Sequence, residues 1–316
     1  RPPRSTLFPY TTLFRSAAMK ILKQIIMVCL ILSNQIITSG YSQTIRTVGG
    51  AGANYPTLKS AFNAINTGVI QGEIVLQITG STTETSSAVL NASGKGHASY
   101  SSITIYPNGS GYLIGGNFNA VLIDLSGADN VTIDGRVNQT GAVDLTLVNP
   151  NTGTASSTIR FLNSAENNNI KYCNIRGSSL GGSSGVIIFS SSSSGSGNDN
   201  DVVENCNITN ASNNRSINLI LSSGTSGREN SNVIIRDNSF FDFFNSGNNS
   251  NGLNILANSV NWTVSGNSFF ETTTFIPTAS VNYYVIKIST PSNHLISNNY
   301  IGGSTTACGG AARSEE

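Results

Sequence analysis

Three aspartates spaced five residues apart, Asp124, Asp129 and Asp134, come closest in this sequence to a pair of carboxylates that could cleave a glycosidic bond. In such a pair, one carboxyl group serves as the acid and the other as the base or nucleophile. Gly127 and Gly135 lie close by, and Asp beside Gly is typical of tight turns. We therefore expect these aspartates to shape turns, and we assign no catalytic residue to the chain.

A second group of carboxylates, Asp199-Asn200-Asp201, has the oxygen ligands that Ca²⁺ prefers. It follows the Ser- and Gly-rich tract Ser190–Gly197, whose composition is typical of a flexible connection. We expect the three residues to end a loop. No cofactor is expected, and calcium at this segment is the alternative that stays open.

The remaining side chains that could do chemistry stand apart from one another. His97 follows Gly and Lys residues in an expected loop, and His294 aligns with Trp262 at a strand position. Surface or packing roles are therefore expected for both histidines. Arg160 and Arg176 have no acidic partner at a recognisable spacing.

Composition narrows the classes of function. The 316 residues include 40 Asn, 46 Ser and 32 Gly, 10% of the residues are charged, and the formal net charge is +1. Such a chain lacks the excess of Ala, Leu, Glu and Lys that a helical bundle has. It also lacks the basic surface that displaces counterions from a nucleic acid, so no nucleic-acid partner is expected.

An internal repeat predicts the elements that position these side chains. Short runs of β-branched residues recur at intervals of 29, 28, 37, 33, 32, 29 and 32 residues. Repeats of this length without helical periodicity predict an all-β solenoid of about eight coils, each with a strand, a tight turn, a second strand and a loop. The central apolar residues of the runs, called anchors below, are Leu76, Ile105, Ile133, Ile170, Val203, Ile235, Val264 and Ile296.

The position three residues after the anchor forms a column that reads Cys173, Cys206, Asn238, Asn267 and Asn299. In stacked coils these residues lie about 4.8 Å apart. Asn tolerates the left-handed conformation of a tight turn, and stacked amides can hydrogen-bond from coil to coil, so we predict a structural ladder. Cys fits the same position. Two free buried thiols are favoured over a disulfide, because this spacing exceeds the usual distance of about 3.5–4.5 Å between the β-carbons of a disulfide.

Two further columns complete the pattern. We expect the apolar column five residues after the anchor to face the core: Ile175, Ile208, Phe240, Phe269 and Ile301. Opposite charges on adjacent strands attract, so a column of alternating sign is expected to be a solvated ladder on the outer face rather than a catalytic track. This column stands one residue after the anchor and reads Asp134, Lys171, Glu204 and Arg236.

The segment before the first anchor predicts a cap. Thr57 is suited to the N-cap of a helix that starts at Leu58. One face of this helix is apolar and carries Leu58, Ala61, Phe62 and Ile65. A single repeat contacts only its neighbours, so the end of a solenoid needs a lid. We expect the helix to close the front of the solenoid.

The opening segment and the later repeats resemble the secreted right-handed parallel β-helix proteins of the pectin-lyase-like superfamily. The motif V-G-G…Y-P-T-L-x-x-A runs from Val48 to Ala61, and the copies IKYCNI, VENCNI and ISNNYI look like the repeats of that group. The resemblance covers about Thr44–Gly303 and implies a right-handed parallel β-helix with an N-terminal capping helix. It extends to large repetitive exported proteins of some Gram-negative bacteria, which end in a C-terminal sorting domain.

The resemblance says more about fold than about activity. Polygalacturonase-like hydrolases of this superfamily show N-T-D, D-D, G-H-G and R-I-K segments, and this sequence contains none of them. Pectate-lyase-like enzymes use calcium carboxylates with a basic residue as proton acceptor. No sorting domain is recognisable.

Both ends of the sequence differ in character from the repeats. Residues 1–16 resemble the translation of a sequencing adapter and residues 313–316 its reverse partner, so 1–18 and 313–316 are left out of the fold, and the gene is expected to be cut near Ala312. Residues 19–43 have the basic start, apolar run and small residues of a secretory signal peptide. Residues 44–312 remain as a β-helix domain that is expected to be truncated at its C-terminus.

These observations predict a secreted or outer-cell-surface solenoid with no transmembrane segment after the signal is removed. We expect a monomer with a non-catalytic structural, adhesive or glycan-binding role, whose partner is a polysaccharide or a cell-surface glycan. The alternative is a polysaccharide lyase or glycoside hydrolase that acts on acidic polysaccharide. Acidic and basic side chains gathered over two or three neighbouring coils would favour the alternative.

Overall fold

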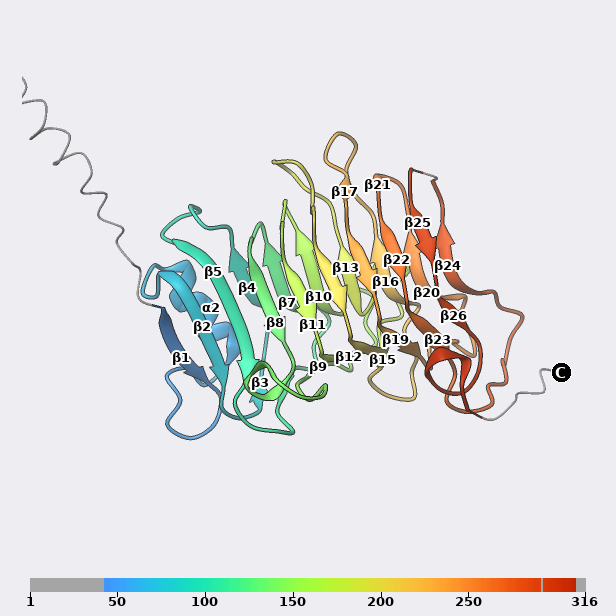
Figure 1. The fold of residues 1–316 in the computed structure, drawn as a ribbon, viewed down its shortest axis with the longest axis horizontal. Coiled ribbons are helices and arrows are strands. Elements are labelled where there is room, and N and C mark those ends of the chain that lie inside the picture. Colours follow the sequence, from blue (N-terminus) through green and yellow to red (C-terminus); the bar gives the residue numbers. More distant parts are fainter. Residues whose placement is uncertain (1–42, 291, 311–316) are drawn as a thin grey trace, which may run out of the picture. The chain divides into compact units, whose positions relative to one another are not determined.

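The computed structural model describes residues 43–290 and 292–310. The segments expected to derive from the adapter, and all but the last residue of the expected signal peptide, lie outside the described residues. The described part is an all-β solenoid of about eight coils, as predicted (Figure 1). No helix among these residues is both long and apolar enough to cross a membrane.

Three parallel sheets, here called A, B and C, run along the solenoid. Sheet A contains β1 (Thr44–Val48), β2 (Gly72–Ile78), β5 (Tyr100–Pro107), β8 (Val131–Asp134), β11 (Asn169–Lys171), β14 (Val202–Glu204), β18 (Ile234–Arg236), β22 (Thr263–Ser265) and β25 (Leu295–Ser297). Sheet B contains β3 (Thr82–Thr83), β6 (Leu113–Gly115), β9 (Thr146–Asn149), β12 (Asn174–Gly177), β15 (Asn207–Asn210), β19 (Ser239–Phe241), β23 (Ser268–Phe270) and β26 (Tyr300–Ile301). Sheet C contains β4 (Ala88–Asn91), β7 (Val121–Ser126), β10 (Ser157–Leu162), β13 (Ile187–Phe189), β16 (Asn218–Ser222), β20 (Ser250–Ile255) and β24 (Tyr283–Ile288).

The register of sheet A confirms the repeat that was read from the sequence. Every anchor is the direct partner of the next one, from Leu76 and Ile105 to Val264 and Ile296. The unequal gaps between anchors are therefore taken up in the loops. A shorter sheet, β17 (Asn230–Ser231) with β21 (Ser259–Val260), forms in two of these loops.

The prediction of two strands per repeat was wrong, because each anchor strand of sheet A is followed by a separate strand of sheet B; in the last five coils these two strands meet at a two-residue corner. Strands β11 and β12, for example, are separated by Tyr172 and Cys173. The left-handed residue of the corner comes one position before the predicted one. Positive φ angles between 53° and 69° are found at Tyr172, Asn205, Asp237, Gly266 and Asn298. The ladder residue that follows stays in the ordinary region and directs its side chain to the neighbouring coil.

The core consists of apolar columns that stack between the sheets. Ile175, Ile208 and Phe240 are fully buried, and the Phe240 and Phe269 rings stack at 4.7 Å. In sheet C the rings of Phe161 and Phe189 stack at 4.5 Å. Ile301, the last member of its column, is 59% exposed, because no coil of the described chain follows it.

The capping helix is α2 (Leu58–Asn66), and Thr57 is its N-cap, as predicted. Thr57 and Ser60 bond each other's backbone in a capping box. The buried carboxylate of Glu84 accepts the N–H groups of Leu58, at 2.8 Å, and Lys59, at 3.1 Å. A carboxylate at this end of a helix satisfies free N–H groups and opposes the helix dipole, so Glu84 joins the cap to the first coil.

We expect the variant Ile235→Asp to unfold several coils, because Ile235 is completely buried and an unpaired carboxylate in an apolar core costs several kcal/mol. Lys171→Ala, at a partly exposed side chain in the same sheet, is expected to change the free energy of unfolding by about 0.5 kcal/mol. Denaturant unfolding measures both effects, and equal midpoints for the two variants would contradict this description of the core.

Candidate functional site

The predicted ladder positions form a chain of buried hydrogen bonds. The side-chain oxygen of Asn238 accepts the N–H of Cys206 at 2.9 Å, that of Asn267 accepts the N–H of Asn238 at 3.0 Å, and that of Asn299 accepts the N–H of Asn267 at 3.0 Å. The side-chain N–H groups bond to carbonyl oxygens of the preceding coil, such as that of Val203 at 2.9 Å. Each amide oxygen thus satisfies a backbone N–H at the corner, where no strand ladder does so, and the amide N–H ties it to a strand of sheet A.

Sulfur takes the place of the amide in two coils. The N–H of Cys173 points to the sulfur of Cys206 at 3.4 Å, which repeats the ladder geometry. Both cysteines are free buried thiols in the structure. Burial raises the pKa of the Cys173 thiol, and the neighbouring Cys206 raises it further. A thiol of this kind is a structural group rather than a nucleophile.

A second column of corners escaped the sequence reasoning. Six residues, each three before an anchor, have φ angles between 56° and 58°, and all are asparagines: Asn130, Asn167, Asn200, Asn232, Asn261 and Asn293. The signal was present in the sequence, since Asn stands at this position in six successive repeats. Asn is the side chain that best tolerates the left-handed conformation after Gly. These two corners of the coil account for part of the high Asn content.

Asp201 is a buried carboxylate at a position that suits a side-chain amide. Asp201 is fully buried, and its Oδ1 atom accepts the backbone N–H of Asn168 at 2.9 Å and its side-chain N–H at 3.0 Å. The Oδ2 atom of Asp201 has no hydrogen-bond partner among the described residues. Burial raises the pKa of Asp201 well above the ordinary range, against the opposing bonds from Asn168. A raised pKa favours the neutral carboxylic acid, which resembles an amide.

The alternating charges lie in one column, but part of the column is buried. Asp134 and Lys171 approach to 3.7 Å, and Arg236 and Glu204 to 2.5 Å. Asp134 is completely buried, so the prediction of a fully solvated ladder was wrong at this end. The cause is Arg136, which binds both oxygens of Asp134 at 2.9 and 2.7 Å and covers them.

The other acidic candidates are also engaged in structural contacts. Asp124 does not shape a turn, because it lies within β7 and binds Arg160 of the next coil through two bonds of 3.0 and 2.6 Å. The partner of Arg160 thus lies one coil away, 36 positions earlier in the sequence. Asp129 accepts the N–H of Glu166 at 2.8 Å. The three aspartates therefore each have a partner of their own.

The histidines and the segment Asp199-Asn200-Asp201, where calcium was the alternative, lie apart from one another. His97 is exposed in a loop, and Nδ1 of His294 accepts the N–H of Trp262 at 3.2 Å. Asp199 accepts the N–H of Ser231 at 2.9 Å. No group of three or more His, Cys, Asp or Glu in the described parts of the chain is placed to hold a metal ion.

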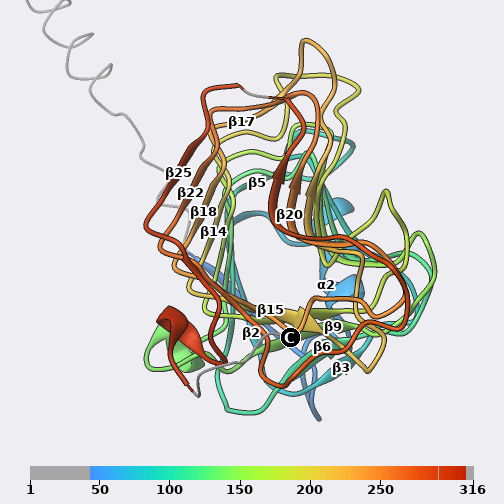
Figure 2. The ribbon, with the colours of Figure 1, turned by 90° about the vertical axis from the view of Figure 1, so that its right-hand side faces the viewer.

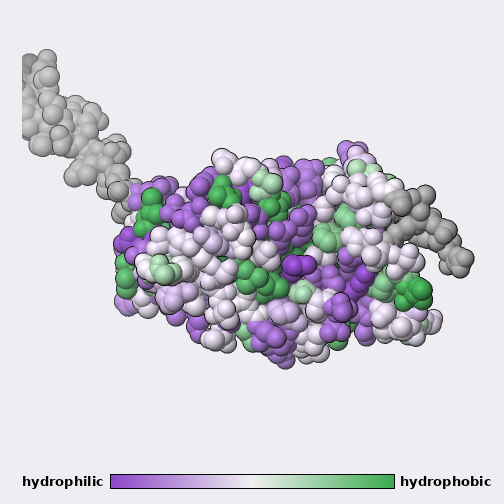
Figure 3. Space-filling view, turned by 90° about the horizontal axis from the view of Figure 1, so that it is seen from below, coloured by the Kyte–Doolittle hydropathy of each residue, from purple (hydrophilic) through white to green (hydrophobic). Residues whose placement is uncertain are grey.

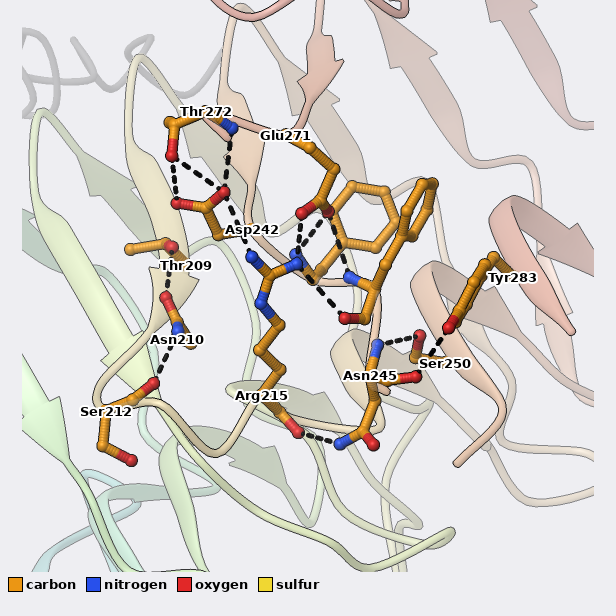
Figure 4. A network of polar contacts seen from close by, with 12 residues as sticks. Thr209, Asn210, Ser212, Arg215, Asp242, Asn245, Ser250, Glu271, Thr272 and Tyr283 are labelled. Atoms are coloured by element: carbon orange, nitrogen blue, oxygen red, sulfur yellow. Dashed lines mark hydrogen bonds and ion pairs between the residues drawn. The ribbon is translucent and has the colours of Figure 1, made fainter. Parts of the chain in front are cut away.

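Charged side chains from three successive coils meet outside the ladder (Figure 4). Arg215 lies between β15 and β16, Asp242 directly follows β19, and Glu271 directly follows β23. Arg215 pairs with Glu271 through Nη1 and approaches Asp242 at 3.5 Å through Nη2. The sequence held a signal for this cluster that we missed, since an acidic residue follows Ser-Phe-Phe in both repeats.

The network closes on the loops that follow sheet B. Oε1 of Glu271 accepts the N–H groups of Phe243 at 2.9 Å and Phe244 at 3.0 Å. Asp242 accepts the N–H of Thr272 at 2.9 Å, and Arg215 bonds to the carbonyl of Phe244 at 3.2 Å. Burial raises the pKa of Glu271, and this effect exceeds the opposing one of Arg215.

Aromatic rings lie against this network. The Arg215 guanidinium stands over the Phe275 ring at 4.6 Å, and the rings of Phe244 and Tyr283 stack at 4.5 Å. The Tyr283 hydroxyl donates to the carbonyl of Asn245 at 2.8 Å. Phe244, Phe275 and Tyr283 are each partly exposed. We call Arg215, Asp242, Phe244, Glu271, Phe275 and Tyr283 the loop cluster.

The ladder can be tested at one rung. Asn238→Ala leaves the Cys206 N–H without a partner in the core and removes the side-chain bond to the Val203 carbonyl, and we expect a loss of about 2–4 kcal/mol in the free energy of unfolding. Asn232→Gly is the matched control, because Gly accepts the left-handed corner and only the exposed amide contacts with Asn200 and Asn261 are lost. Chemical denaturation would contradict the assignment if both variants lost the same stability.

Asp201 makes stability depend on pH with a defined sign. Because folding raises its pKa, its contribution is fully present below the pKa of the unfolded chain and is lost as pH rises through the folded pKa. Asp201→Asn supplies the amide, and we expect it to add about 1–3 kcal/mol near pH 7, with a gain that shrinks toward pH 4. Thermal unfolding across this range measures the change, with Asp199→Asn as the control that brings no gain.

Comparison with known proteins adds no assignment to this geometry. No family model matches the chain, and neither a curated protein nor a solved structure matches it.

Proposed function

We propose that this chain is a non-catalytic, extracellular or cell-surface solenoid that binds carbohydrate through the loop cluster. The observation that carries the proposal is the partly exposed set of rings, Phe244, Phe275 and Tyr283, held beside Arg215 and Asp242. Aromatic rings offer a flat apolar surface to the C–H groups of a sugar, and neighbouring polar side chains can bond its hydroxyls.

The network around Glu271 supports a binding role, because it fixes the loops before a ligand arrives. Three successive coils are joined through one buried carboxylate and one guanidinium. Groups held in place by such contacts lose little conformational freedom on binding, which favours affinity. The repeated coils beneath provide a rigid support for these loops.

A polysaccharide lyase or glycoside hydrolase is the second candidate, and the same cluster favours it. Asp242 and Glu271 supply two carboxyl groups beside a basic residue, and the raised pKa of Glu271 suits a general acid. We rank this function second because Oε1 of Glu271 accepts two backbone N–H groups and Oε2 pairs with Arg215. A carboxyl group bound in this way is not free to transfer a proton to a substrate.

Binding can be measured with a panel of immobilised neutral and acidic polysaccharides. We expect Phe275→Ala to weaken binding about tenfold, or by about 1.4 kcal/mol, because it removes a ring that contacts the sugar. Phe241→Ala is the matched control, since this ring stacks on Phe270 at 5.3 Å in sheet B, outside the loop cluster. Equal losses in the two variants, or no binding to any polysaccharide, would contradict the proposal.

Catalysis is tested separately, by incubating the chain with acidic polysaccharides with and without calcium. We expect no shortening of the polymer and no unsaturated product. Product formation that disappears in the variant Glu271→Gln would overturn the non-catalytic assignment and establish the second candidate.

A further inference from the structure

The loop cluster lies in the loops that connect sheet B to sheet C. Figure 2 looks along the solenoid, and in it these loops of successive coils extend to the right of β15 and β20. Three of the loops carry the cluster, namely residues 211–217, 242–249 and 271–282. On the face of the molecule seen in Figure 3, hydrophobic side chains occur in small groups among hydrophilic ones, which suits a polar ligand better than an apolar protein surface.

The charges of these three loops are balanced within the loops themselves. Arg215 is their single basic residue, and Asp242 and Glu271 are their acidic residues. Figure 4 shows both carboxyl groups at the tip of the Arg215 side chain, where Glu271 pairs with Nη1 and Asp242 approaches Nη2 at 3.5 Å. The Phe275 ring covers one face of the guanidinium, and the Arg215 side chain is 14% exposed. These loops therefore hold no second cation that an acidic ligand could bind.

Asp242 keeps the capacity to accept a further hydrogen bond. Its Oδ1 atom accepts the N–H of Thr272 at 2.9 Å, whereas the Thr272 hydroxyl, at 2.8 Å, is the one group of the described chain that bonds to Oδ2. A carboxylate oxygen has two acceptor sites, and the Asp242 side chain is 18% exposed. Asp242 belongs to the middle one of the three coils, so described residues on both sides form its surroundings. An anion with a free acceptor site thus lies beside the rings of the cluster.

We infer that the loop cluster selects neutral polysaccharides and rejects those built from uronic acids, an inference that rests on the proposed carbohydrate-binding function. The rings of Phe275 and Tyr283 contact the C–H groups of a neutral sugar, and the Asp242 carboxylate accepts one of its hydroxyls in a charge-assisted bond. A uronic acid brings its own carboxylate next to Asp242 without a counter-charge, and like charges across an interface exclude the wrong partner. Arginine usually binds a carboxylate through two parallel N–H bonds, but Glu271 and Asp242 already occupy Arg215.

The test compares neutral polysaccharides with their own oxidised forms. A soluble β-glucan, a mannan and a galactan are each used unchanged and after oxidation of the C6 hydroxyls to carboxylates. Calorimetry then measures the affinity of the full chain for both forms. We expect the neutral form to bind about tenfold more tightly than the oxidised form, because each oxidised sugar adds an uncompensated charge beside Asp242.

Asp242→Asn tests the residue that makes this selection. The carboxamide oxygen still accepts from Thr272, so the loop keeps its bonds while the negative charge is lost. We expect the ratio between the two affinities to fall about fivefold, mainly through tighter binding of the oxidised form. The matched control is Asp237→Asn, which removes the same charge from an exposed corner at the other end of β19, where Asn tolerates the φ of 55°. It is expected to leave the ratio unchanged, and circular dichroism establishes that each variant is folded.

The outcomes separate this inference from the proposed function. If the oxidised form binds as tightly as the neutral form, or more tightly, and Phe275→Ala still weakens that binding, the selection of neutral sugars is overturned and the carbohydrate-binding role stands. A ratio that Asp242→Asn leaves unchanged, or that Asp237→Asn lowers by as much, would also overturn the inference. Binding to neither form of any of the three polysaccharides would overturn the inference together with the proposed function.

Discussion

The fold depends on one constraint: the chain must turn between three sheets in each coil, and at the buried corner between sheets A and B the backbone N–H groups have no strand partner and no access to water. Strand ladders satisfy the straight segments alone. At the corner between sheets A and B, the amide of Asn238 takes the N–H of the coil before it and returns its own N–H to that coil. Unpaired backbone groups in a core cost as much as lost hydrogen bonds, so the composition is constrained at the corners as strongly as in the core.

The same constraint explains how much of the fold could be predicted. The anchors were readable because apolar side chains such as Ile235 must recur at the period of the coil, and the cap was readable because apolar side chains such as Phe62 recur at helical spacing after the N-cap Thr57. The corner was placed one residue late, at Asn238 rather than Asp237, because the left-handed residue and the hydrogen-bonding residue are neighbours and both are often Asn. A single sequence does not separate a residue chosen for its backbone conformation from one chosen for its side-chain bonds.

The candidate site was less predictable than the fold for a different physical reason. The partners of a charged side chain here lie one or two coils away, so the spacing that joins Arg215 to Glu271 is 56 residues and that from Asp124 to Arg160 is 36. These separations depend on the lengths of the intervening loops, which differ from coil to coil. Asp242 and Glu271 stand at the same position of successive repeats, so they could be paired by aligning the repeats. Arg215 lies in a loop whose sequence does not align with the other repeats.

The ladder also gives the solenoid a direction, which bears on how its two ends differ. Each Asn side-chain oxygen accepts a backbone N–H of the preceding coil. The backbone N–H of every ladder residue therefore needs an acceptor on the next coil. A helix can end the stack at the front, because Asn66 supplies the donor and acceptor that a strand would have supplied to sheet C, and Glu84 of the first coil accepts the free N–H groups of the helix. At Asn299 the described chain has no equivalent group, and the apolar column ends there with Ile301 exposed. A repeat that is stabilised by its neighbours therefore needs a group outside the repeat pattern wherever the stack stops, as α2 shows at the front.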